Sequence, residues 1–543
     1  MVSARWRGWA GRLGRARWRG WAGRLGWAAG VAVAGAGLFW CYLLVSRTAG
    51  VTSDASSNAL QAWDMLHGNV LLHGWWLSDV SFYTTELPEY ALVEWVHGLR
   101  PDDVHICAAI TYTLLVLLTA LVARGTARGR EGTIRALLGG GLLLAPTLGF
   151  TSNAVLASPD HTGTGVPIMA ALLLLDRVKP RWYVPVAILL ILGWVEVADP
   201  LALVAGAAPV GAVCLFRAAK WLVPRWRSSE GGPGWYDPAL AVAAGGSVLA
   251  ARFAVEAIRA HGGFYVNPVP GTLFATTSAL PHQLRTTGLS VLILFGADPV
   301  AQPDGLPLTF ALIHLAGIAV AAVGLLIGLW RFLGRLDRVS QILLCGTLAV
   351  LAAGWLGTHM SSGFSAHEIA PVLPFGAALA GRMVGERLAG LPRRWAEPAL
   401  AIGLAGYLAA LGFLAAQPSV PAADRDPDLA ALLVSHGLRD GLAGYWQASS
   451  TTLETGGQVT LAPIYGGSAY LWEVKAAWYD PATRYANFLV TVSEPPAEAV
   501  FTKPSVMRRL FGRPIAEYLL GRYSVLVYDK NLLLTLIPFP APP

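Results

Sequence analysis

Apolar stretches long enough to cross a membrane recur along most of this 543-residue chain and dominate what it can fold into. Hydrophobic residues make up 55% of the sequence and charged residues only 13%, which excludes an ordinary soluble domain. We therefore predict a polytopic α-helical membrane protein with about eleven transmembrane helices, since one span needs roughly 20 mostly apolar residues. The expected spans lie near residues 27–46, 104–124, 134–150, 163–176, 182–198, 200–217, 237–257, 306–330, 339–357, 368–382 and 396–416.

The formal net charge of +7 is distributed in a way that indicates membrane topology rather than nucleic-acid binding. Loops rich in Arg and Lys alternate along the chain with loops that are not. Because basic loops stay in the cytoplasm, a basic N-terminus on that side places every such loop on the same side. An odd number of spans then places the C-terminal region outside the cytoplasm. We expect a multi-pass protein of the cell membrane whose partners include membrane lipids.

Three regions follow from this topology. Residues 1–26 form a basic cytoplasmic tail with a tandem repeat, which we interpret as a duplication in a tolerant segment rather than a helix on the membrane surface. Residues 27–417 form the transmembrane domain, with a long first external loop at 47–103. Residues 418–543 mix helical and strand-like patterns and predict a small extracytoplasmic α/β domain. The four cysteines fall in apolar segments, so we expect neither disulfides nor a structural zinc site.

The first external loop begins with an acidic residue, Asp54, close to the end of the first span. Apolar residues at helical spacing between Ala59 and Leu66 predict an amphipathic helix along the membrane interface, with Asp64 facing water. Aromatic residues that fit anchoring at the membrane interface follow it: Trp75, Trp76, Phe82, Tyr83, Tyr90 and Trp95.

Two further external segments carry groups able to do acid–base chemistry. Asp160 and His161 are adjacent before one predicted span, and His367 and Glu368 are adjacent before another. Acids in external loops are usually solvated, but Asp54 and Asp160 each lie within about ten residues of a helix end, where a charge is costly. A single histidine there is more often a hydrogen-bonding residue than a catalyst. On one face of the membrane, however, these side chains predict an acidic site at the depth of the lipid headgroups.

Such a site suits a sugar donor linked to a lipid phosphate, because the tail would lie in the bilayer and the phosphate at its surface. Attack of an acceptor hydroxyl on the anomeric carbon needs a general base, and a carboxylate within hydrogen-bonding reach can supply it. The leaving polyprenyl phosphate needs cationic or metal stabilisation more than it needs a proton. Asp160 is the candidate to hold a divalent cation or to orient the acceptor.

The order of these features resembles the GT-C superfamily of integral membrane glycosyltransferases. The resemblance rests on an Asp just after the first helix, on the loop pattern "WW…F..TELP.Y.L..W", and on "HEIAPVLPFGAALAGR" before a late helix. The tail "LRDGLAGYWQASSTTLETGGQVTLAPI" also looks like the external domain of bacterial members. The closest branches are the dolichyl-phosphate-mannose–protein mannosyltransferases and the bacterial lipid A aminoarabinose transferases.

The resemblance implies an inverting transferase that uses a polyprenyl-phosphate sugar and an envelope glycan, lipid or protein as acceptor. It implies that Asp54 is the catalytic carboxylate and Asp160 the second acid. We expect substrate contacts from Tyr83, Glu86, His161, His367 and Glu368. The chain departs from the superfamily in having "SDAS" where many members have two adjacent acids, and His367 where an Arg is more usual.

Two other classes of function remain open from the sequence. A lipid or polymer transporter would place charges deep in several helices and show repeat symmetry, and the sequence offers little of either. A non-catalytic envelope protein could keep the fold and bind partners through its external domain. The missing second acid beside Asp54 is the feature that favours this alternative.

Overall fold

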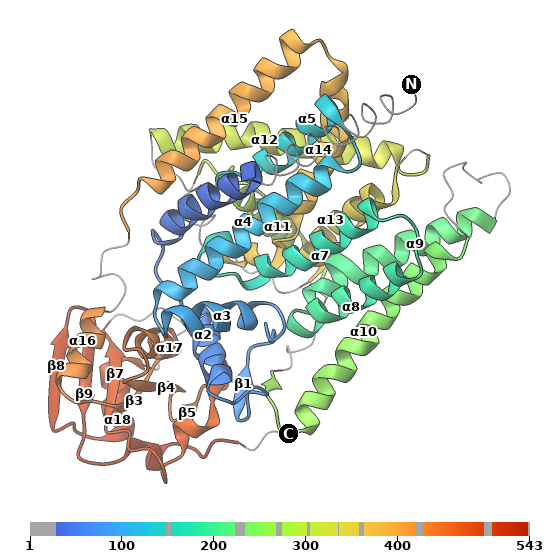
Figure 1. Cartoon of the computed structure of the whole chain (residues 1–543). Helices are drawn as coiled ribbons and strands as arrows, with labels where there is room; N and C mark the ends of the chain where they lie inside the picture. The colour runs from blue at the N-terminus through green and yellow to red at the C-terminus, as the bar shows by residue number, and fades with distance from the viewer. Residues whose placement is uncertain are drawn as a thin grey trace, which may run out of the picture.

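A computed structural model gives the arrangement of residues 29–147, 149, 154–222, 234–267, 274–300, 305–334, 336–357, 363–419, 427–493 and 502–540. The basic tail 1–26 lies outside these described residues. The molecule has two parts, a large bundle of helices and a C-terminal α/β domain at one end of it (Figure 1). The segment that follows the first helix lies between them.

Helices form at every position where the sequence predicts a span. They are Ala29–Ser46, α4 (Asp102–Arg124), α5 (Gly129–Gly141), α7 (Asp160–Arg177), α8 (Tyr183–Ala198), η1 with α9 (Leu203–Ala207, Ala208–Leu222), α10 (Tyr236–Ala260), α12 (Leu306–Arg331), α13 (Arg338–Leu356), α14 (Val372–Gly390) and α15 (Arg393–Ala415). Among the described residues, seven helices are long and apolar enough to cross a membrane on their own. The protein is thus a multi-pass membrane protein, while the total of eleven spans stays a prediction. The short helix α11 (Leu280–Leu294) contains most of another apolar segment.

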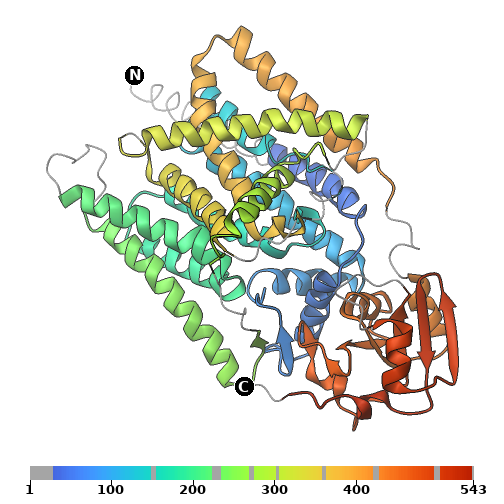
Figure 2. The same cartoon turned by 180° about the vertical axis from the view of Figure 1, so that it is seen from behind.

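The bundle is built around α4, α5 and α14, while α8, α9 and α10 pack together along one side (Figure 2). Small residues allow the central helices to approach closely. A Cβ atom at Gly381 of α14 would lie 2.6 Å from the carbonyl oxygen of Arg135 in α5. A larger residue there would force the two helices apart, so glycine sets this crossing.

The C-terminal domain contains a six-stranded mixed sheet in the order β5-β4-β3-β7-β9-β8. Its strands β3 and β4, and β3 and β7, pair in parallel, whereas the pairs β4–β5, β7–β9 and β8–β9 are antiparallel. The strands are β3 (Asp440–Ala443), β4 (Thr460–Tyr465), β5 (Ser468–Ala469), β7 (Phe488–Val492), β8 (Ala516–Leu520) and β9 (Tyr523–Val527). The helices of the domain are α16 (Pro427–Ser435), α17 (Tyr445–Glu454) and α18 (Pro504–Phe511).

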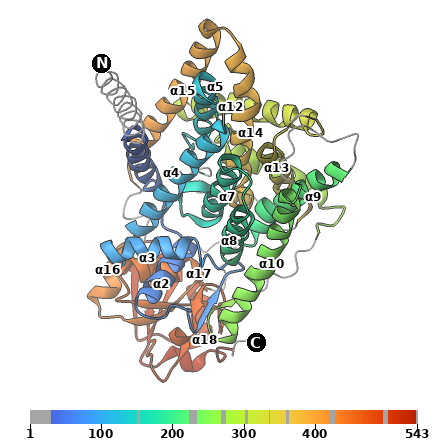
Figure 3. The same ribbon diagram turned by 45° about the vertical axis from the view of Figure 1, so that its right-hand side comes forward.

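A second, three-stranded sheet ties distant parts of the chain together. Strand β1 (Trp75–Leu77) pairs in parallel with β2 (Tyr265–Val266) and antiparallel with β6 (Val474–Lys475) of the C-terminal domain. Helix α2 (Ser53–Leu66) packs between α3 (Glu86–His97) and α17. The segment after the first helix is therefore a structured layer between the bundle and the C-terminal domain (Figure 3).

This layer corrects two expectations about the first loop. Trp75, Trp76, Phe82 and Tyr90 are buried in the protein, so their assignment as membrane anchors is wrong, whereas Trp95 is 75% exposed. Sequence alone cannot distinguish an aromatic side chain buried by lipid from one buried by another part of the protein.

Asp64 was expected to face water, and this expectation is wrong as well. Its carboxylate accepts hydrogen bonds from Lys475 Nζ at 2.8 and 2.9 Å, from Trp75 Nε1 at 2.8 Å and from Asn69 Nδ2 at 2.6 Å. Lys475 belongs to β6, so Asp64 connects α2 directly to the C-terminal domain.

Candidate active site

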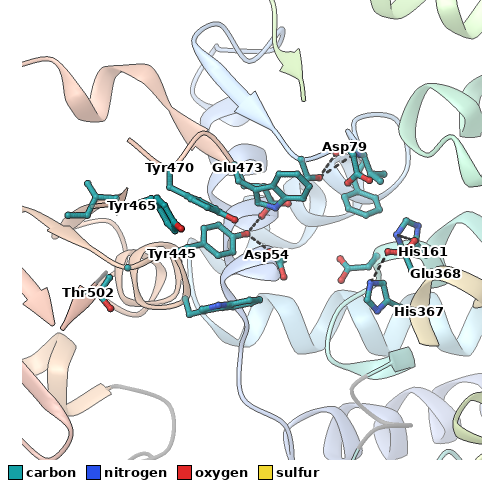
Figure 4. A pocket seen from close by; sticks show the side chains of 18 residues that line it. Asp54, Asp79, His161, His367, Glu368, Tyr445, Tyr465, Tyr470, Glu473 and Thr502 are labelled. Atoms are coloured by element: carbon teal, nitrogen blue, oxygen red, sulfur yellow. Dashed lines mark hydrogen bonds and ion pairs between the residues drawn. The ribbon is translucent and has the colours of Figure 1, made fainter. Parts of the chain in front are cut away.

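A cavity of about 640 Å³ lies where α2, the N-terminal end of α7, the segment before α14 and the C-terminal domain meet. Figure 4 shows that its side chains come from segments far apart in the sequence and converge on one space. The lining residues are Asp54, Ser78, Asp79, Val80, Phe82, Asp160, His161, His367, Glu368, Gly444, Tyr445, Trp446, Ile464, Tyr465, Tyr470, Trp472, Glu473 and Thr502.

The structure brings Asp54 and Asp160 to this same cavity. Asp54 lies in the first turn of α2, and Asp160 is the first residue of α7, so both carboxylates sit where a helix N-terminus favours negative charge. Burial, together with the charge of Asp160, raises the pKa of Asp54 to about 6, although a hydrogen bond from Tyr445 opposes the rise. A carboxylate with this pKa can be ionised at neutral pH and still accept a proton readily.

Backbone strain concentrates at the same cavity. Four non-glycine residues of the described chain have positive φ angles, and three of them line it: Phe82 (48°), Asp160 (25°) and Glu473 (49°). Such conformations cost on the order of 1–3 kcal/mol each and are retained where the surroundings require them, most often at functional sites.

His161 is held in a fixed orientation on α7. Its Nδ1 lies 2.8 Å from Oδ2 of the buried Asp199, which also accepts hydrogen bonds from the Thr164 hydroxyl and from the backbone N–H of Leu201 at 2.8 Å. This arrangement leaves Nε2 of His161 for the cavity, where it lies 3.8 Å from Oε2 of Glu368. The ring of His367 stacks on that of His161 with centroids 5.5 Å apart.

His161, His367 and Glu368 together fit a divalent cation. Each offers a ligand atom, and these atoms lie within 4.8 Å of one another. Donors on one tetrahedral zinc ion lie about 3.3–3.6 Å apart, so the ligand atoms would have to move closer by up to about 1.5 Å. A histidine oriented by a carboxylate on its other nitrogen, as Asp199 orients His161, is the usual support for a metal ligand.

The charge of the cavity is unbalanced. Five of its described lining residues are acidic, and none is Lys or Arg. Any anionic group that enters must therefore be stabilised by the two histidines, by a bound cation or by backbone groups.

A second cavity, of about 520 Å³, adjoins the first and shares Asp79, Val80, His161 and Glu368 with it. Its other lining residues are mostly apolar and come from η1, α13 and neighbouring segments, among them Leu201, Val204, Phe274, Val350, Leu356 and Ile369. An apolar chamber that shares a wall with an acidic one suits an amphipathic molecule with a polar head and a hydrocarbon tail.

Two of the expected substrate-binding residues do not line either cavity. The hydroxyl of Tyr83 donates a hydrogen bond to the carbonyl oxygen of Val70, and its ring packs on Phe264. Glu86 is buried against Gly163 of α7, where a Cβ atom would meet its carboxylate oxygen at 2.1 Å. Both side chains contact other parts of the protein in this structure, and a direct role in substrate binding stays a prediction.

Tyr445 and Glu473 were not predicted from the sequence. Asp199 follows the end of α8, and the "VEVADP" pattern marks it as an acid at the external end of a helix, although no role was predicted for it. Tyr445 and Glu473 belong to the C-terminal domain, and no local pattern indicates that this domain reaches Asp54.

No protein-family model matches this sequence, and no curated protein matches it by sequence. The structure, however, is similar to ArnT from Cupriavidus metallidurans. The match to ArnT bound to undecaprenyl phosphate has a TM-score of 0.55 at 11% identity and covers 93% of this chain and 99% of ArnT. The match to apo ArnT has a TM-score of 0.54 at 12% identity, over 95% and 100% of the two chains.

The oligosaccharyltransferase of Archaeoglobus fulgidus matches with a TM-score of 0.49 at 14% identity, over 93% of this chain and 74% of that one. The likeness to ArnT extends over nearly the full length of both proteins. The chain therefore has a GT-C-like fold, as the sequence resemblance predicted.

Proposed function

We propose that this protein is a membrane glycosyltransferase that moves a sugar from a polyprenyl-phosphate donor to an acceptor hydroxyl on the extracytoplasmic face. The observation that carries the proposal is the adjacency of the two cavities, in which an acidic chamber containing Asp54 and Asp160 shares a wall with an apolar one. The first suits a reacting sugar and the second a polyprenyl chain. ArnT, whose fold this chain shares, binds undecaprenyl phosphate, which supports the same class of donor.

In the proposed reaction Asp54 is the general base. It takes the proton of the acceptor hydroxyl as the oxygen attacks the anomeric carbon, while the bond from that carbon to the phosphate oxygen breaks and its electron pair leaves with the polyprenyl phosphate. A single displacement of this kind inverts the anomeric configuration. Asp160, across the same cavity, orients the acceptor or helps to hold a cation.

The leaving phosphate is best placed against His161 and His367, because the described cavity offers no Lys or Arg. Asp199 favours the protonated form of His161 through the hydrogen bond to Nδ1. Alternatively, with His161 neutral and no proton on Nε2, a divalent cation held by His161, His367 and Glu368 would stabilise the phosphate in place of the imidazolium. His367, which stands where an Arg is more usual in the superfamily that the sequence resembles, would then bind phosphate by different chemistry.

Among possible acceptors, we favour the hydroxyl of an uncharged glycan. The excess of acidic side chains in the cavity disfavours a phosphorylated or otherwise anionic acceptor beside the phosphate of the donor. Aromatic residues of the C-terminal domain line the same cavity, and Trp446 and Tyr465 keep 45% and 49% of their surfaces exposed. Exposed aromatic side chains with a polar tip suit a sugar, which combines apolar faces with hydroxyl groups.

The test compares envelope glycans by mass in a deletion strain that expresses the wild-type protein, Asp54→Asn or Asp428→Asn. Asp428 is an exposed acid of α16 and serves as the matched control. We expect the deletion to lose a sugar, which the wild-type protein and Asp428→Asn restore and Asp54→Asn does not, provided that all three accumulate in the membrane. Restoration by Asp54→Asn would refute the catalytic assignment. A deletion with unchanged glycans would instead favour a transporter or a non-catalytic envelope protein.

A further inference from the structure

Tyr445 connects the C-terminal domain to the candidate base. It is the first residue of α17, and its hydroxyl lies within hydrogen-bonding distance of both Asp54 Oδ1 and Glu473 Oε2, the latter at 2.8 Å. Figure 4 shows the tip of its side chain facing these two carboxyl groups. The backbones are fixed as well. Ser53 donates to the carbonyl oxygen of Tyr445 at 2.6 Å, and Ser57 donates to that of Glu473 at 3.1 Å.

The number of protons in this group limits its arrangement. A tyrosine hydroxyl has one hydrogen and can donate to only one of its two carboxyl neighbours. The other carboxyl must therefore carry a proton of its own and donate it to the tyrosine oxygen. Otherwise two negative charges would face one oxygen at close range, which is costly in a buried site.

Burial decides which carboxyl carries that proton. Glu473 is 3% exposed, whereas Asp54 is only half-buried and borders the cavity. Burial raises the pKa of Glu473 well above its usual range, and it raises that of Asp54 only to about 6. At neutral pH the protonated Glu473 thus donates to Tyr445, and Tyr445 donates to the ionised Asp54.

The backbone of Glu473 agrees with a specific task. Its φ of 49° is a left-handed conformation that an L-residue adopts at a cost, and it is retained immediately before β6. This conformation directs the side chain toward Tyr445 while the next two residues pair with β1.

We propose that Tyr445 and Glu473 are positioning residues of the proposed transferase, through which the C-terminal domain keeps Asp54 ionised and oriented as the base. The inference rests on the function proposed above. Tyr445 occupies Oδ1 of Asp54, which leaves Oδ2 to receive the proton of the acceptor hydroxyl as the new glycosidic bond forms. The titratable groups that act on Asp54 are Tyr445 and Glu473 from the C-terminal domain and Asp160 from α7.

The experiment measures restoration of the missing envelope sugar in the deletion strain as a function of external pH. The variants are Tyr445→Phe, Glu473→Gln and, as the matched control, Tyr485→Phe, whose ring is 55% exposed. Loss of a hydrogen bond to a charged group predicts that Tyr445→Phe transfers the sugar about tenfold more slowly or worse at pH 7. Because Asp54 loses a hydrogen-bond donor, it should take up a proton at a higher pH. The activity of Tyr445→Phe should therefore decline at a higher pH than that of the wild type when the medium is acidified. Glu473→Gln keeps a donor to the tyrosine oxygen and should therefore lose less activity at pH 7 than Tyr445→Phe does.

A second measurement does not depend on transfer. In the infrared spectrum of the purified protein at pH 7, Glu473→Gln should remove the C=O stretch of a protonated carboxyl group. If that signal is unchanged, Glu473 is ionised and the proposed arrangement is wrong. If Asp54→Asn abolishes transfer but Tyr445→Phe matches the wild type at every pH, the positioning role is refuted while the proposed function stands. Full transfer by Asp54→Asn refutes both.

Discussion

Asp64 provides the sharpest test of how the C-terminal domain is attached, because one carboxylate serves three donors from two parts of the protein. The change is Asp64→Ala. It leaves Lys475, Trp75 and Asn69 without their acceptor. We expect this substitution to destabilise the protein far more than an ordinary surface change does.

The magnitude follows from the exposure of each donor. Trp75 is 2% exposed, so its indole N–H would stay buried and unpaired at a cost of about 1–3 kcal/mol. Lys475 is 25% exposed and can turn to water, so its ion pair contributes about 1 kcal/mol. Asn69 is close enough to solvent for its side-chain amide to donate to water instead of to Asp64. The total is about 2–4 kcal/mol, and Lys475→Ala alone should cost about 1 kcal/mol.

The assay is thermal unfolding of the detergent-purified protein, followed by tryptophan fluorescence, to which Trp75 itself contributes. Asp428→Ala on the exposed face of α16 is the control and should change stability by less than about 0.5 kcal/mol. Two results would refute the reasoning. One is an Asp64→Ala protein as stable as the control, and the other is a Lys475→Ala protein destabilised as much as Asp64→Ala.

Three further predictions concern other groups. Burial and the charge of Asp103 raise the pKa of Glu94 to about 10, so the folded state loses stability as pH rises from about 4.5 towards 10. Glu94→Gln should therefore unfold at a higher temperature than wild type at pH 8, and the difference should shrink at pH 5. Arg382→Ala should cost about 3–5 kcal/mol in the same assay, because Arg382 is 3% exposed and ion-paired, whereas Arg393→Ala at an exposed pair should cost under about 1 kcal/mol. Saturating Zn²⁺ should stabilise the wild type by about 2.7 kcal/mol at 100 times its dissociation constant, and His367→Ala should abolish the effect.

Local pattern was sufficient to predict the helices of the bundle. Each expected span overlaps a helix, because hydrophobic length is a direct physical requirement for crossing a bilayer. The predicted membrane topology also indicated which loops lie on the same side of the membrane. This was enough to expect Asp54, Asp160 and His161 to lie close together, and they line one cavity.

Contacts between distant segments could not be predicted in this way. The polar residues of α2 and the aromatic pair Trp75–Trp76 carry patterns typical of a helix and anchors at the membrane surface, yet both are covered by the C-terminal domain and its neighbours. Whether an apolar side chain meets lipid or protein depends on tertiary packing, which hydropathy does not encode. Tyr445 could not be predicted for the same reason, because its contact with Asp54 depends on tertiary packing.

The distance along the chain between Asp54 and Tyr445 has a consequence for how the protein is made. The two residues are 391 positions apart, and at a synthesis rate of about 5–20 residues per second roughly 20–80 seconds pass between them. During that interval the first helices can enter the membrane while one wall of the cavity is still missing. Under the function proposed above, Asp54 lacks the partner that orients it until the chain is nearly complete. Synthesis of the C-terminal domain would then be the step that brings the site to full activity.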